Sequence, residues 1–327
     1  MENRTASFTS ASVFPAKILA NPELIREIRQ KKLIPCWHVQ LNPTNRCNLS
    51  CPFCSCSERD KRIELSYDEI MEIMTKAKKV GCKSVTITGG GEPLIHPRIN
   101  DIIKGIKNLE IDIGIVTNGL LLGQVPTEIL SMITWIRISS GDYRDFGKRY
   151  EEMLSGVVER GNNVDFAFSH VVGKHPNYDT IIELVKFANN HRFTHIRLVS
   201  DLLDLESSKD MEAIKEKLKE HGVDDSLVIY QGRKEFTKGT QKCYISLLKP
   251  VITPNGKIVA CCGWQYRKSN ISRDYDTEEN MCNAKDIDKF YEKQSYYDGS
   301  GCDRCYYSAY NNALEVLLSE IKHKQFV

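Results

Sequence analysis

The sequence predicts an α/β fold built from parallel strand-helix units. From residue 37 onward, short runs rich in β-branched residues alternate with stretches of helical periodicity, which is typical of parallel βα units. Residues 66–69 (SYDE) form a capping box that begins one helix, and Gly81 provides its C-terminal stop. Asn21 and Pro22 predict the start of an N-terminal helix that ends near residue 32.

The expected elements follow from these patterns taken along the chain. Strands are expected at 37–41, 84–88, 111–117, 135–139, 164–170 and 195–200. Helices are expected between 66 and 81 and at 98–108, 127–132, 150–160, 178–190, 209–221 and 313–323. A turn at 254–256 (PNG) predicts a hairpin of 251–253 and 257–260.

Composition sets limits on function. The 327 residues are 41% hydrophobic and 27% charged, as expected for a globular protein with a full core. Because 45 basic and 43 acidic residues leave a net charge of +2, nothing in the charge favours a nucleic acid or membrane partner. No apolar run reaches the roughly 20 residues of a membrane span, and no secretory signal is present, so we expect a cytoplasmic protein. Twelve cysteines in such a chain indicate metal ligation rather than disulfides.

The first cysteine group directly follows the first expected strand. Cys47, Cys51 and Cys54 have C-x3-C-x2-C spacing, and aromatic Phe53 precedes the last of them. Three thiolates leave one position of a metal site open for a ligand, whereas a structural zinc site usually supplies four. Iron-sulfur clusters accept cysteine-rich loops of this kind. A zinc site or an inert thiol cluster is the alternative.

This loop resembles the signature of radical S-adenosylmethionine (SAM) enzymes. The resemblance implies a partial (βα)6 barrel, a 4Fe-4S cluster held by the three cysteines, and SAM bound at the open iron. It also implies that 89–93 (GGGEP), directly after the second strand, contacts the SAM amino group through Gly90, Gly91 and Glu92. A glycine run alone is more often a simple turn.

Further SAM contacts are implied at the ends of later strands. Residues 138–142 resemble the segment that meets the SAM ribose and carboxylate, although a turn that caps the next helix is equally compatible with this sequence. Arg197 is either a contact of the SAM carboxylate or an ordinary ion-pair residue. The expected contacts beyond Phe53 and the glycine segment are Asn118, Ser139 or Ser140, Asp142 and Arg197.

A second cysteine group lies near the C-terminus. Its pattern, C-x12-G-x4-C followed by C-x2-C, resembles the auxiliary-cluster module called SPASM or its one-cluster form, the twitch domain. The matching residues Cys243, Cys261, Cys302 and Cys305 predict an auxiliary 4Fe-4S cluster, with a zinc ribbon as the alternative. Cys262 and Cys282 are additional thiols, and the roles of Cys36, Cys56 and Cys82 stay open.

The expected organisation is an N-terminal extension (1–36), the barrel (37–205), a helical bridge (206–240), a small α+β auxiliary-cluster domain (241–307) and a C-terminal helix (308–327). The extension is too short for a leader-peptide-binding domain, which favours a small polar substrate or a peptide bound without one. The resemblance implies oxidation of that substrate after hydrogen abstraction, with an electron from a reductant such as flavodoxin or ferredoxin. One alternative is a redox-neutral epimerase with Cys56, Cys262 or Cys282 as the hydrogen donor. Another is a non-catalytic iron-sulfur or zinc protein.

Overall fold

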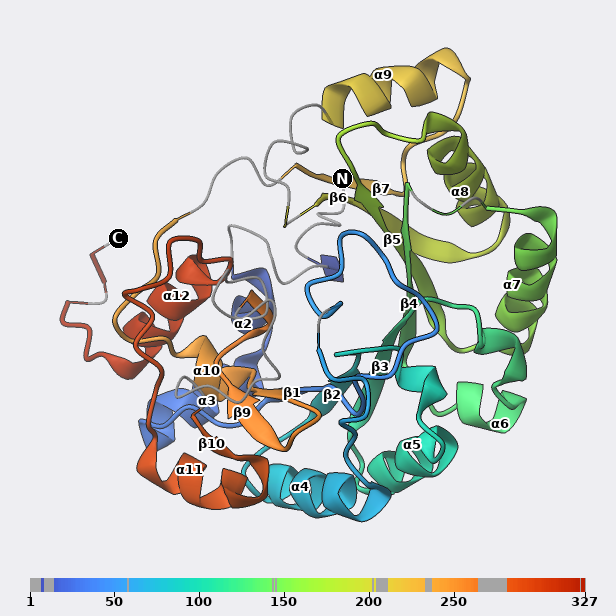
Figure 1. Ribbon diagram of the computed structural model, residues 1–327. Coiled ribbons are helices and arrows are strands. Elements are labelled where there is room, and N and C mark those ends of the chain that lie inside the picture. Colours follow the sequence, from blue (N-terminus) through green and yellow to red (C-terminus); the bar gives the residue numbers. More distant parts are fainter. Residues whose placement is uncertain are drawn as a thin grey trace.

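The computed structural model describes residues 7–8, 15–57, 59–142, 144, 146–201, 203, 211–232, 237–263, 281–323 and 325–326. Its strands form one curved sheet in the order β10-β9-β8-β1-β2-β3-β4-β5-β6-β7 (Figure 1). The six central strands run parallel, which confirms the predicted α/β barrel architecture. They are β1 (His38–Leu41), β2 (Ser84–Ile87), β3 (Asp112–Thr117), β4 (Trp135–Gly141), β5 (Asp165–Val172) and β6 (Phe193–Ser200).

Helices cover the outer, convex face of this sheet (Figure 1). The capping box predicted for α4 (Tyr67–Lys79) is present, because the Glu69 amide donates to Ser66 Oγ and the Ser66 amide donates back to Glu69 Oε2 at 3.0 Å. Buried aliphatic side chains on each helix face the strands and form the core. The other helices of this face are α5 (Ile99–Asn108), α6 (Thr127–Leu130), α7 (Lys148–Arg160) and α8 (Tyr178–Asn190), with short 3-10 turns at Pro93–Ile95 and Leu122–Gln124.

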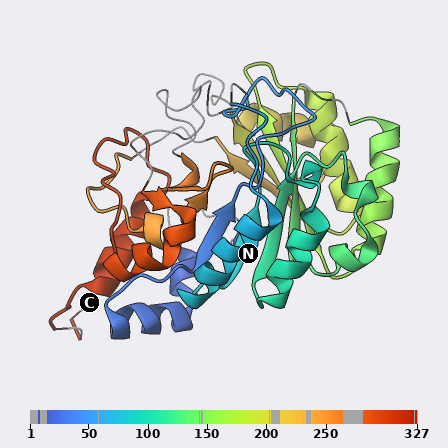
Figure 2. The same ribbon diagram turned by 60° about the horizontal axis from the view of Figure 1, so that its bottom comes forward.

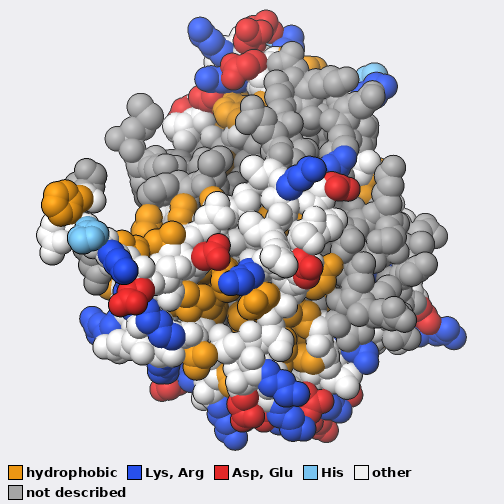
Figure 3. Space-filling view, turned by 90° about the vertical axis from the view of Figure 1, so that its left-hand side faces the viewer, with side chains coloured by type: hydrophobic (Ala, Val, Ile, Leu, Met, Phe, Trp, Pro, Cys, Tyr) orange, Lys and Arg blue, Asp and Glu red, His pale blue; other side chains and the backbone are white. Residues whose placement is uncertain are grey.

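The N-terminal helices α2 (Ala16–Leu19) and α3 (Pro22–Lys31) pack beside the C-terminal region (Figure 2). As predicted, Asn21 caps α3, and its side-chain oxygen accepts a hydrogen bond from the Leu24 amide at 3.0 Å. This region contains α10 (Ile245–Leu248), η4 (Ala284–Asp286), α11 (Ile287–Lys293) and α12 (Ser308–Leu318). Basic and acidic side chains are interspersed along the lower edge of the face seen in Figure 3.

Two features of the sheet escaped the sequence prediction. The segment expected as a helical bridge contains α9 (Met211–Glu220) and then β7 (Val228–Gln231), which pairs in parallel with β6. At the other edge, β8 (Val251–Ile252) pairs in parallel with β1. The predicted hairpin is present as β8 and β9 (Lys257–Val259), and β10 (Cys282–Asn283) pairs with β9.

The final helix begins earlier than predicted. We expected 313–323, but α12 covers Ser308–Leu318. Tyr310, Leu314 and Leu317 are buried at helical spacing, whereas Ile321 is 38% exposed. The prediction used aliphatic residues only and therefore missed Tyr310, the first buried residue of the helix. The first residues of the helix predicted at 209–221 lie outside the described residues, and α9 is described from Met211. Among described helices, none has the length and apolar character needed to cross a bilayer.

Candidate functional site

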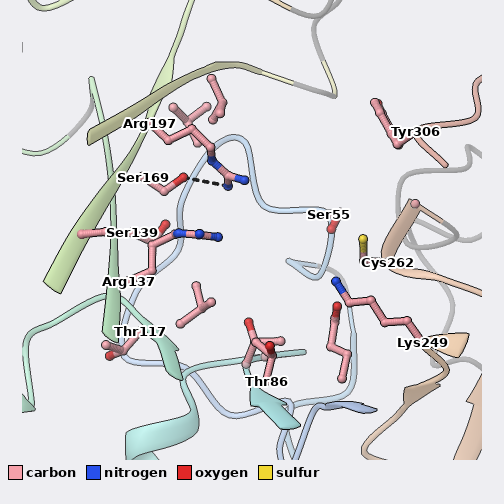
Figure 4. Close-up of a pocket in the computed structure, with 18 of the residues that line it drawn as sticks. Ser55, Thr86, Thr117, Arg137, Ser139, Ser169, Arg197, Lys249, Cys262 and Tyr306 are labelled. Carbon is pink, nitrogen blue, oxygen red and sulfur yellow. Dashed lines mark hydrogen bonds between the residues drawn. The ribbon is translucent and has the colours of Figure 1, made fainter. Parts of the chain in front are cut away.

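A cavity of about 870 Å³ lies inside the curved sheet (Figure 4). Its wall combines the cysteine loop that follows β1, side chains that point inward from β1 to β6, and residues of the C-terminal region. Cys47, Cys51, Phe53 and Cys54 all line it, so the structure brings the first predicted cluster loop to the cavity.

The cysteine loop is closed at its base by backbone pairing. Thr44 and Glu64 form an antiparallel bridge, and the Asn45 amide donates to the Ile63 carbonyl at 3.0 Å. Within the loop, the Leu49 amide donates to Cys47 Sγ at 3.4 Å, and the Cys56 amide donates to Cys54 Sγ at 3.4 Å. Amide donors of this kind stabilise the negative charge of metal-bound thiolates.

The thiols of this loop lie within electrostatic reach of one another. Burial raises the pKa of Cys47, and the charges of Glu92 and Cys51 raise it further. The hydrogen bond with Cys56, followed by burial, raises the pKa of Cys54. Among the described residues, no three Cys, His, Asp or Glu side chains are grouped as they would be around one metal ion. Three thiolates from one short loop are a donor set that iron-sulfur clusters accept, so the residue types of this loop fit a cluster.

The glycine segment after β2 packs directly on the base of the cysteine loop. The Gly91 amide donates to the Thr44 carbonyl and the Glu92 amide donates to the Arg46 carbonyl, both at 2.8 Å. A Cβ atom at Gly91 would overlap the Arg46 carbonyl oxygen, and one at Gly90 would overlap Asn45 Oδ1. Glycine is therefore required by close approach at these positions.

The Glu92 carboxylate lines the cavity but is mainly bound by the protein. It accepts hydrogen bonds from the Leu94 amide at 3.0 Å, Thr117 Oγ1 at 2.6 Å and the Asn118 amide at 2.7 Å. Burial raises the pKa of Glu92, although these donors partly counteract the rise. Glu92 thus ties the end of β2 to the end of β3, and the Asn118 side chain continues this link by donating to Asn48 Oδ1 at 2.7 Å.

At the end of β4, the structure distinguishes Ser139 from Ser140, which the sequence could not. Ser139 lines the cavity, whereas Ser140 is buried and is absent from the cavity wall. Asp142 accepts hydrogen bonds from His170 Nε2 at 2.8 Å, the Gly173 amide at 2.6 Å and the Asn177 amide at 3.1 Å. Burial alone would raise the pKa of Asp142, but His170 and these amides lower it overall. Asp142 therefore joins the loops after β4 and β5.

Polar side chains at alternate strand positions line the cavity, and sequence reasoning missed most of them. On β4, Arg137 and Ser139 line the cavity, whereas Ile138 is fully buried in the core and is absent from the cavity wall. Arg197 on β6 was predicted, and its Nη2 donates to Ser169 Oγ at 2.9 Å (Figure 4). Parallel strands are normally apolar on both faces. Polar residues at every second position of such a strand could therefore have indicated the cavity-facing side from the sequence alone. The other inward residues missed are His38, Gln40, Thr86, Ser169 and Lys249.

Backbone pairing holds the segments that carry three cysteines of the second group, Cys243, Cys302 and Cys305. The Cys243 amide donates to the Tyr297 carbonyl at 3.0 Å, and the Gly239 amide donates to the Cys302 carbonyl at 2.8 Å. Thr237 and Cys305 form an isolated antiparallel β-bridge. Burial raises the pKa of Cys243 to about 12, and the charges of Cys305 and Cys302 contribute. Cys261 is close to Gly263, where a Cβ atom would lie 3.4 Å from its Sγ.

The additional thiols separate by location. Cys262 lines the cavity, and its Sγ lies 3.2 Å from Tyr307 Oη. Cys282 lies on β10 and is absent from the cavity wall, so the geometry favours Cys262 over Cys282 as a hydrogen donor. Cys56 also lines the cavity, whereas Cys36 and Cys82 are fully buried in the core.

Comparisons with known proteins agree with this geometry. The family model of the radical SAM superfamily matches residues 41–218. A GTP 3',8-cyclase of Clostridium perfringens (strain SM101) is 24% identical over 265 residues, which are 70% of this chain and 81% of that protein. The radical SAM cyclopropyl synthase TigE of Paramaledivibacter caminithermalis is 26% identical over 314 residues, which are 82% of this chain and 65% of that protein.

A solved structure shares the fold as well. The structure of Streptococcus suis SuiB bound to the precursor peptide SuiA superposes with a TM-score of 0.57 at 19% identity, over 80% of this chain and 69% of that chain. The family model covers more than half of the sequence, including the cysteine loop and the glycine segment. This chain therefore belongs to the radical SAM superfamily.

Proposed function

We propose that this chain cleaves SAM reductively and abstracts a hydrogen from a substrate bound in the cavity, with an auxiliary 4Fe-4S cluster assisting oxidation of a small polar molecule or peptide. One observation carries the proposal. The three loop cysteines and Cys262 of the second cysteine region line the same cavity of about 870 Å³. This volume lies in the upper part of the range of about 300–1,000 Å³ for small-molecule sites, which leaves room for SAM and a second molecule.

The residues of the chain have separate parts in this proposal. Cys47, Cys51 and Cys54 would hold the first cluster, which together with SAM supplies the 5'-deoxyadenosyl radical when bound. Glu92 fixes the ends of β2 and β3 around the SAM position, and the glycine segment holds the cysteine loop against them. Ser139 and Asn118 offer polar groups on the same wall.

The auxiliary site would be enclosed by Cys243, Cys261, Cys302 and Cys305. With four protein ligands it would have no open position, so its role would be electron transfer or stabilisation of the domain rather than substrate binding. A one-electron reductant such as flavodoxin or ferredoxin would supply electrons to the first cluster. Family membership favours this enzyme over a non-catalytic metal protein.

The names of the relatives support two substrate classes. SuiB is bound to a precursor peptide, whereas the cyclases act on GTP by their name. A substrate panel should therefore contain peptides and small polar molecules, including GTP.

The test is a double substitution, Cys302→Ser with Cys305→Ser, in anaerobically reconstituted protein. We expect deoxyadenosine to form from SAM while oxidised product is lost, because abstraction precedes electron transfer to the auxiliary cluster. Mass spectrometry of the substrate panel measures both compounds. Since metal ligation can stabilise a small region, far-ultraviolet circular dichroism must first show that the variant is folded. A folded variant that still gives product at the wild-type ratio to deoxyadenosine contradicts the electron-acceptor role.

A redox-neutral epimerase is the second candidate, and the location of Cys262 favours it specifically. A thiol that lines the substrate cavity is placed to return a hydrogen atom to a substrate radical; the thiyl radical that remains would be restored to the thiol by one electron from the reductant and one proton from solvent. In deuterated water, the epimerase would incorporate solvent deuterium at the product carbon, and Cys262→Ser would abolish product but keep deoxyadenosine. Cys282→Ser is the matched control because Cys282 lies outside the cavity wall. Product without solvent deuterium excludes the epimerase.

A further inference from the structure

The thiol of Cys262 has a tyrosine as its neighbour on the cavity wall. Cys262 and Tyr307 both line the cavity, and Cys262 Sγ lies 3.2 Å from Tyr307 Oη. The two residues come from different elements, since Cys262 follows β9 and Tyr307 directly precedes α12. The fold therefore places a phenol in hydrogen-bonding contact with the thiol that could return a hydrogen atom to a substrate radical.

Tyr307 is fixed in this position by its packing and by its backbone. Its side chain is buried, and its ring meets the ring of Tyr310 edge to face with the centres 6.0 Å apart. Its amide donates to Cys305 Sγ at 3.4 Å, and its carbonyl accepts from the Asn311 amide at 2.9 Å. A group held by its surroundings in the geometry that a reaction needs does not have to be ordered at the moment of reaction. The phenol of Tyr307 is therefore preorganised against the thiol.

A positive charge lies beside this pair. Lys249 Nζ is 5.8 Å from the centre of the Tyr307 ring, and Lys249 and Cys262 project from the same side of the cavity (Figure 4). Burial lowers the pKa of Lys249, and the charge of Cys262 partly offsets this effect, so the amine lies within electrostatic reach of the thiol. An ammonium near an aromatic face is attracted to its electron density. Lys249 therefore opposes the loss of an electron alone from Tyr307 but not the loss of a neutral hydrogen atom.

We propose that Tyr307 is a hydrogen-atom relay that restores the thiol of Cys262 after each transfer. When Cys262 has given its hydrogen atom to a substrate radical, the O–H bond of Tyr307 breaks and a new S–H bond forms on Cys262. The thiyl radical is thereby reduced, and Tyr307 is oxidised to a neutral tyrosyl radical. One electron from the one-electron reductant and one proton from solvent then restore the phenol.

The chemistry of the two groups suits this exchange. Thiol S–H and phenol O–H bonds have similar strengths, so a hydrogen atom can pass between them with little driving force. The inference rests on the proposed function in its epimerase form, because it supplies the step that regenerates the hydrogen donor.

The experiment traps the radical with SAM as the only added probe, so it needs no identified substrate. Reconstituted holoenzyme in deuterated water receives dithionite equal to one electron per chain, and SAM is then added before rapid freezing. Without a substrate, the cavity thiol is the expected hydrogen source for the deoxyadenosyl radical. Electron paramagnetic resonance identifies the trapped radical, and mass spectrometry measures solvent deuterium in deoxyadenosine.

The variants are Tyr307→Phe, Cys262→Ala and the matched control Tyr244→Phe. Tyr244 is also buried and also lies close to a cysteine of the second group, Cys243, but it is absent from the cavity wall. Circular dichroism and iron content show whether each variant is folded and loaded. Wild-type protein is additionally prepared with tyrosine that carries deuterium on its ring.

We expect a tyrosyl radical in the wild type, with a spectrum that narrows in the ring-deuterated protein because the ring hydrogens cause its splitting. The signal should persist in Tyr244→Phe and be lost in Tyr307→Phe and Cys262→Ala. Deoxyadenosine should carry solvent deuterium in the wild type and in Tyr307→Phe, and lose this label in Cys262→Ala. A tyrosine that only supports the fold would give no such spectrum.

A tyrosyl signal that survives in Tyr307→Phe, or that is lost equally in Tyr244→Phe, overturns the inference. Wild-type protein that forms deoxyadenosine without a tyrosyl signal also overturns it, and this result holds even if Tyr307→Phe does not fold. If deoxyadenosine then still carries solvent deuterium, Cys262 acts without Tyr307 and the epimerase reading survives. If no deoxyadenosine forms in the wild type, the proposed function fails and the inference fails with it.

Discussion

The contact between the glycine segment and the cysteine loop gives the most specific mutational prediction. In Gly91→Ala, the new methyl group would overlap the Arg46 carbonyl oxygen, which is backbone and cannot rotate away. The loop base must move, and the hydrogen bonds from the Gly91 and Glu92 amides, each 2.8 Å long, must lengthen or break. Overpacking costs about 1–3 kcal/mol and each lost hydrogen bond about 0.5–1.5 kcal/mol, so the expected destabilisation is about 2–6 kcal/mol.

The assay combines the thermal unfolding midpoint of the apoprotein with the iron content after reconstitution. Gly91→Ala should lower both, because the displaced segment leads directly into Cys47. Gly156→Ala is the matched control, since a Cβ atom there has no neighbour within 4 Å and the residue lies inside α7. This control should keep the wild-type iron content and unfold at the same or a higher temperature. Wild-type stability and iron content in Gly91→Ala would refute the packing argument.

Three further predictions concern metal content, Glu92 and Asp142. Reconstituted wild-type protein should contain about eight iron and eight sulfide per chain, the sum for two four-iron clusters; about four iron with one zinc would show that the second site is a zinc site. Glu92→Gln should lower the thermal midpoint and the affinity for SAM, because an amide nitrogen would face the buried donors of Leu94, Thr117 or Asn118, at a cost of about 1–3 kcal/mol; an unchanged midpoint would contradict this role. The lowered pKa of Asp142 means that its carboxylate stabilises the fold above its ordinary pKa of about 3.9, and that this contribution is lost as the pH falls through the folded-state pKa. The midpoint of the wild type should therefore exceed that of Asp142→Asn at roughly pH 6 and approach it at roughly pH 3; a constant difference would count against the pairing with His170.

Local signals in the sequence predicted much of the fold. The capping box at Ser66 and the Asn21 cap were recognisable because both depend on residues within one helical turn. The six parallel strands followed from their β-branched composition. The edges of the sheet did not, because β8 pairs with β1 across about 210 residues of sequence and no local pattern records such a partner. Strand β7 has only four residues and lies in a polar stretch.

The candidate site likewise has one part that local sequence motifs predict and another that depends on the three-dimensional fold. The cysteine loop and the glycine segment are contiguous motifs, so the sequence was enough to find them. Arg137, Lys249 and His38 come from separate elements and meet only because the sheet curves around a common space. Ser139 and Ser140 are adjacent in sequence, and only the pleat of β4 decides which of them faces the cavity.

The central claim is that the loop after β1 holds the cluster that cleaves SAM. The most direct measurement is deoxyadenosine formation by the triple variant Cys47→Ala, Cys51→Ala and Cys54→Ala, reconstituted anaerobically and supplied with SAM and a strong reductant. We predict no deoxyadenosine above the protein-free background, with about four iron per chain retained at the second site. Deoxyadenosine formation at the wild-type rate would contradict the account.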